Sequence, residues 1–79
     1  MDTPEKNRRE EEAAIERERD AFERRQEAFL RVHKQFLPRG NGMPTEDSMR
    51  ELDRAGAEWK AAHAELERIV QEIRSGKRR

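Results

Sequence analysis

The chain contains no cysteine and no long apolar run. Without cysteine there is no disulfide to hold the fold and no thiolate chemistry. No stretch approaches the ~20 consecutive apolar residues that a membrane-spanning helix needs. The first twelve residues also lack the apolar segment of a secretory signal. We therefore expect a cytoplasmic protein with no membrane partner.

An excess of charge of either sign is also missing, because 18 basic residues balance 18 acidic ones. Neither half of the chain is a basic arm or an acidic tail, so net charge provides no attraction to nucleic acid or to an anionic membrane. Apolar residues make up only 32% of the 79 residues and charged residues 46%. Such a composition is typical either of disorder or of exposed, charge-rich helices.

A seven-residue repeat decides between these two in favour of helices. Large apolar side chains recur every seven residues in the first half, at Ile15, Phe22, Phe29 and Phe36, each preceded by a smaller residue: Ala14, Ala21, Ala28 and Gln35. The second half repeats the spacing at Leu52, Trp59, Leu66 and Ile73. An apolar position with this period stays on one side of a helix, which predicts a partner helix along that side.

Local signals divide the chain into two helices. Pro4 suits the first position of a helix expected over about 4–37, and Pro38 ends it. Residues 38–44 are turn-forming, and Thr45 is the expected cap of a second helix over about 45–75. The hairpin therefore covers residues 13–76. Residues 1–12 have no apolar side chain after Met1 and are expected to fray or protrude, and residues 77–79 form a basic tail.

The two apolar stripes predict an all-α antiparallel hairpin with coiled-coil-like heptads. Counting residues outward from the turn along both helices pairs the stripes in four layers: Phe36 with Leu52, Phe29 with Trp59, Phe22 with Leu66, and Ile15 with Ile73. These eight residues are the predicted core or interface. Two helices cover only one side of each stripe, so the hairpin is expected to self-associate as a homodimeric four-helix bundle. A pair of helices from another, unidentified protein would satisfy the same stripes.

Side chains for catalysis are sparse. His33 and His63 are the only histidines, and they are expected at the edge of the apolar stripe. The Glu-x-x-His pattern of di-iron bundles is absent, since Leu30 and Lys60 stand three residues before them. We expect no catalytic, cofactor or metal site. Trp59 is read as core, or else as an anchor for a partner.

Arginines also repeat every seven residues, at Arg17, Arg24 and Arg31. In a dimer, two such rows suit a phosphate backbone, and the architecture then resembles the small RNA-binding hairpin dimers of plasmid copy-number control. Acidic residues such as Asp20 and Glu23 lie among the arginines and favour a solvated mixed-charge face instead.

The function that this sequence favours is a non-catalytic protein–protein interaction or regulatory adaptor module. Its dimer surface or its N-terminal extension would engage another protein, with Arg8, Arg9 and residues 10–12 as contacts of the extension. The alternative is a small dimeric regulator that binds RNA or DNA through the arginine row.

Overall fold

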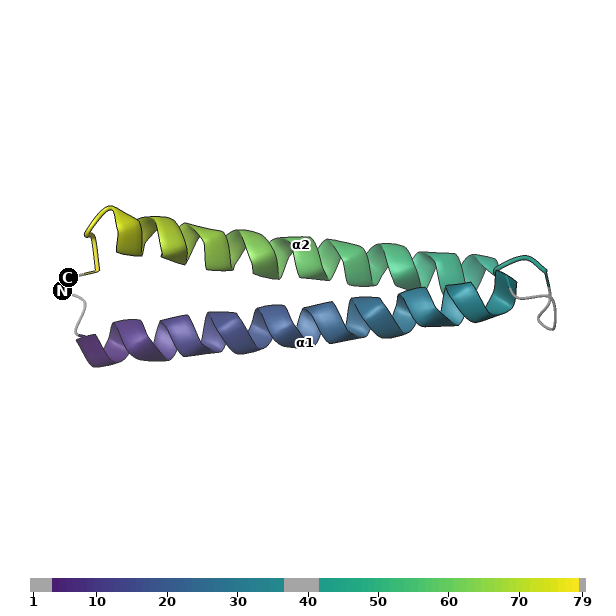
Figure 1. The fold of residues 1–79 in the computed structure, drawn as a ribbon, viewed down its shortest axis with the longest axis horizontal. Coiled ribbons are helices and arrows are strands. Elements are labelled where there is room, and N and C mark those ends of the chain that lie inside the picture. Colours follow the sequence, from purple (N-terminus) through teal and green to yellow (C-terminus); the bar gives the residue numbers. More distant parts are fainter. Residues whose placement is uncertain (1–3, 37–41, 79) are drawn as a thin grey trace.

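The computed structural model describes residues 4–36 and 42–78. Helix α1 spans Pro4–Phe36 and helix α2 spans Glu46–Arg74, and the two pack against each other as an antiparallel hairpin (Figure 1). The rod measures 56 × 17 × 17 Å. The all-α hairpin expected from the sequence is confirmed. Pro38, assigned to the end of the first helix, lies outside the described residues.

Side-chain and backbone caps fix both ends of α2. The Thr45 hydroxyl accepts a hydrogen bond from the Ser48 amide at 3.1 Å, which satisfies one of the unpaired donors of the first turn. At the other end Gly76 has φ +81°, a conformation that costs glycine little, and the Lys77 amide donates to the Glu72 carbonyl at 2.9 Å. This turn leads the chain back toward α1.

The contact between the helices, called the seam below, is made mostly of small residues. Its buried positions are Asn7, Ala14, Ala21, Ala28 and Val32 on α1, and Ser48, Ala55, Ala62 and Ile69 on α2. All but Val32 recur at steps of seven. Alanine lets two backbones approach closely, and the heptad spacing keeps the alanines on the facing sides along the rod.

Gln35 sets the register beside the turn. The side-chain Nε2 of Gln35 donates to the Ser48 hydroxyl at 3.0 Å, and its side-chain Oε1 accepts from the backbone amide of Thr45 at 3.1 Å. Heptad steps from the Gln35–Ser48 pair place Ala28 level with Ala55. The next step places Ala21 level with Ala62. These two layers are therefore alanine on alanine.

The layers predicted from the sequence are wrong. Where the sequence predicts a layer of Phe29 and Trp59, the seam contains Ala28 and Ala55. Ala28 lies one residue before Phe29, and Ala55 lies four residues before Trp59. Both helices carry a small-residue stripe next to a large-residue stripe, and one neighbour can cover only one of them closely. The alanines occupy the seam because phenylalanines there would hold the backbones apart.

The sequence predicts that residues 1–12 fray or protrude, but residues 4–12 lie against the rest of the hairpin. They form the first turns of α1, Asn7 is buried, and Glu10 accepts hydrogen bonds from Arg68 and Arg78. The segment packs through polar contacts with α2 and the turn after it, which an apolar pattern cannot reveal.

We predict that Ala21→Leu destabilises the hairpin, because Ala21 is only 1% exposed and a larger side chain would push the helices apart. The expected loss in free energy of unfolding is about 1–3 kcal/mol, measured by urea denaturation followed by circular dichroism. Ala13→Leu, at an exposed position of the same helix, is the control and should change little. Equal stability of the two variants would contradict the alanine seam.

Candidate interaction face

The seam separates two chemically different sides of the rod. On each helix, the residue one position after a seam residue is rotated about 100° from it around the helix axis. The residue four positions after it is rotated about 40° in the same direction. On α1 the position one after the seam carries Ile15, Phe22, Phe29 and Phe36, and on α2 the position four after it carries Leu52, Trp59, Leu66 and Ile73. These eight residues define the apolar face, and they are the eight predicted from the sequence as core or interface.

The apolar face is largely open to solvent. Phe22 is 44% exposed, Phe29 56% and Phe36 58%, and Ile15 and Ile73 are exposed to a similar degree. Leu52, Trp59 and Leu66 are half-buried. The five exposed residues thus lie outside the core of the hairpin itself. Whether all eight form an interface stays a prediction.

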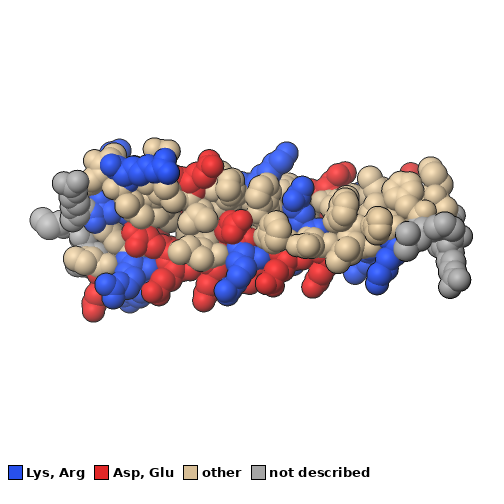
Figure 2. Space-filling model, viewed as in Figure 1, with Lys and Arg blue, Asp and Glu red and all other residues tan. Residues whose placement is uncertain are grey.

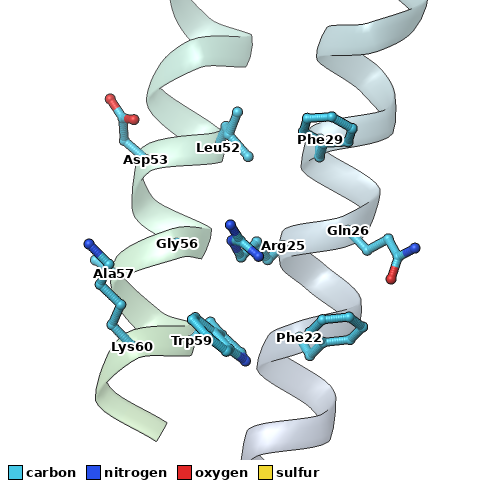
Figure 3. Close-up of a pocket in the computed structure, with 10 residues that line it drawn as sticks. All are labelled: Phe22, Arg25, Gln26, Phe29, Leu52, Asp53, Gly56, Ala57, Trp59 and Lys60. Atoms are coloured by element: carbon cyan, nitrogen blue, oxygen red, sulfur yellow. The ribbon is translucent and has the colours of Figure 1, made fainter. Parts of the chain in front are cut away.

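An open groove of about 620 Å³ lies at the middle of this face (Figure 3). Phe22 and Phe29 line it from α1, and Leu52 and Trp59 line it from α2. The remaining lining residues are Arg25, Gln26, Asp53, Gly56, Ala57 and Lys60. The side chain of Arg25 lies between the helices, while those of Asp53 and Lys60 point away at the margin. The groove therefore combines apolar walls with a mixed-charge rim.

Three neighbours hold the Trp59 side chain in place. Its indole nitrogen donates to the Glu18 carboxylate at 2.9 Å. The guanidinium of Arg25 lies over the indole at 5.1 Å from the ring centroid, a cation–π contact. His63 stacks on the ring at a centroid distance of 5.0 Å. Trp59 is thus a positioned, half-buried aromatic on the wall of the groove.

Sequence reasoning did not find Glu18 or Arg25. Both lie four positions after a seam residue on α1, where a side chain reaches across toward α2. The heptad pattern of apolar residues gives no information about charged side chains, and only the register shows that these two lie beside Trp59. The histidines were placed near the stripe, and each stacks on an aromatic residue of its own helix: His33 on Phe29 at 6.4 Å and His63 on Trp59.

The arginine row lies on the opposite side of the seam. Arg24 forms an ion pair with Glu58 at 3.4 Å, and Arg31 pairs with Glu51. Arg17 and Arg24 also line a second groove that includes Glu58. Figure 2 shows the other side of the rod, where acidic and basic side chains are interspersed along α1 below a band of uncharged side chains. Half-exposed pairs of this kind each contribute about 0.2–1 kcal/mol.

A charged cluster ties the beginning of α1 to the end of α2. Arg78, whose side chain is only 8% exposed, contacts the Glu10 carboxylate at 2.7 Å and that of Glu72 at 3.3 Å. It also donates to the Asn7 amide oxygen at 3.5 Å. Arg68 reaches Glu10 at 3.3 Å. We call these five residues the terminal cluster.

The arginines of the terminal cluster lower the pKa of two carboxyl groups, that of Glu10 in the cluster and that of Glu65 beside it. The hydrogen bond from Arg78, followed by its charge and that of Arg68, lowers the pKa of Glu10. The hydrogen bond and charge of Arg68 likewise lower the pKa of Glu65. Because these pKa values are lower in the folded than in the unfolded protein, the contacts stabilise the fold above the ordinary carboxyl pKa of 4.5. That contribution disappears as the pH falls through the lowered pKa values.

We predict that the hairpin loses stability on acidification and that part of this loss comes from Glu10. Melting followed by circular dichroism between about pH 7 and pH 3 should show a smaller pH dependence for Glu10→Gln than for the unsubstituted chain. The substituted chain should be the less stable of the two at pH 7, and the two curves should converge in acid. Parallel curves would show that Glu10 contributes nothing.

Within residues 4–36 and 42–78, no group of three or more histidine and carboxylate side chains is arranged to hold a metal ion. In the same part of the chain, neither helix combines the length and the apolarity needed to cross a membrane. The chain matches no protein-family model, no curated protein and no solved structure.

Proposed function

We propose that this protein is a non-catalytic protein–protein interaction module that docks partners on its apolar face. The observation that carries the proposal is the exposure of four large apolar residues at heptad spacing on α1, with Ile73 exposed on the same side of α2. Soluble proteins that remain monomeric seldom expose a contiguous apolar strip of this length, and such strips are typical of interaction sites.

The composition of the groove supports the same proposal. Binding energy at interfaces concentrates in tryptophan, tyrosine and arginine near the centre of the contact, and here Trp59 and Arg25 lie together at mid-face. Because Glu18 and His63 already hold the indole, docking a partner costs little further side-chain entropy.

The expected partner presents helices of its own. An apolar stripe at seven-residue spacing is complementary to another amphipathic helix that lies along it. A partner that supplies two helices would complete a four-helix bundle around the present hairpin. The protruding extension considered from the sequence is not part of the proposal, because Glu10 is occupied by Arg68 and Arg78.

Nucleic-acid binding through the arginine row receives less support. Two of the three arginines already pair with carboxylates of α2, which would have to be displaced by phosphates. Changing all three to glutamine should leave binding to RNA or DNA, and its salt dependence, unaltered if the row has only a structural role.

The proposal predicts that Phe22→Gln with Phe29→Gln abolishes partner capture. Removing a central aromatic from an interface costs about 2 kcal/mol or more, which is roughly thirtyfold in affinity for each site. The test is affinity purification of the tagged protein from host cells with quantitative mass spectrometry. Ala13→Gln with Ala61→Gln, both at exposed positions off the apolar face, is the control. Recovery of the same proteins by all three forms would contradict the proposed function.

A further inference from the structure

We propose that the occupant of the apolar face is a second copy of this chain, so that two hairpins form one four-helix bundle. The inference rests on the proposed function of that face and adds the identity of the partner. It is carried by the accessible surface of the hairpin, by the self-complementarity of the face, and by a glycine at its centre.

The hairpin exposes more surface than a folded chain of its mass ordinarily does. Its accessible surface is 6636 Å², whereas a compact monomer of 9.4 kDa exposes about 5,000 Å². Two such chains packed into a body as compact as an average monomer would expose about 8,300 Å², so each copy can bury up to about 2,500 Å². The total is within the range of permanent, apolar interfaces, about 2,000–5,000 Å² or more.

A second copy matches the apolar face in length, spacing and charge. It supplies a stripe with the same seven-residue period along the same 56 Å rod, which an unrelated partner would have to match independently. The chain has a net charge of zero, so two copies do not repel one another as wholes. In a two-fold dimer the same patch serves both partners, and this patch contains both projecting aromatics and a hollow.

The hollow lies at Gly56, which has no side chain and lines the groove. This glycine lies in the interior of α2, where glycine costs about 1 kcal/mol of helix stability relative to alanine. Its φ is not positive, and an added Cβ would meet nothing within 4 Å. Nothing within the described part of the hairpin therefore requires glycine here. Gly56 lines the groove one turn from Trp59, where an absent side chain leaves room for an aromatic of the other copy.

Sedimentation equilibrium of the purified chain from micromolar to millimolar concentration is the test. We expect the mass of a dimer. Gly56→Leu, which fills the hollow, should weaken association about tenfold or more. Ala64→Leu, at an exposed position of the same helix, should leave the dimer intact. Gly56→Ala separates association from folding, because it should strengthen the helix and still weaken the dimer.

A chain that remains monomeric at every concentration overturns the inference. So does a dimer that Gly56→Leu leaves unchanged. If the monomer still captures a different protein, and does so only with Phe22 and Phe29 intact, the second copy is excluded while the proposed function stands. If the Phe22→Gln, Phe29→Gln chain dimerises and captures proteins as the unsubstituted chain does, both fail.

Discussion

The close approach of two alanine-lined helices is the constraint on which the rest of this structure depends. With Ala21 and Ala28 on one helix level with Ala62 and Ala55 on the other, the seam has room for nothing larger at these layers. The phenylalanines that follow each alanine are therefore turned about 100° away, onto one flank of the rod. The apolar face is a geometrical consequence of how the seam is filled.

Because alanines line the seam, the hairpin buries little of its own apolar surface. Alanines contribute little hydrophobic stabilisation because each buries a single methyl group, and among the residues that the structure describes Ile69 is the only large side chain less than 2% exposed. Half-exposed ion pairs such as Arg24–Glu58 add little. The large side chains of the apolar face, whose burial would stabilise a small domain, lie outside the seam.

Polar contacts determine how the two ends are closed. Gln35 joins α1 to the cap of α2 beside the turn, and Arg78 joins the turn after α2 to the first turns of α1. These contacts fix the register and leave the middle of the apolar face free. The structure thus combines a rod of fixed register with an open apolar face, the feature on which the proposed function depends.

The sequence by itself determined the two helices, their antiparallel order and the eight residues of the apolar face, because helical periodicity and turn chemistry are local properties. It also carried both stripes, alanine and phenylalanine, at the same seven-residue spacing. Spacing alone cannot show which of two neighbouring stripes faces the other helix. Only the tertiary structure decided that Ala28 faces the second helix while Phe29 faces outward, because that choice depends on how closely two backbones can approach. The partners of Trp59 were decided in the same way, since Glu18 and Arg25 reach it only in this register.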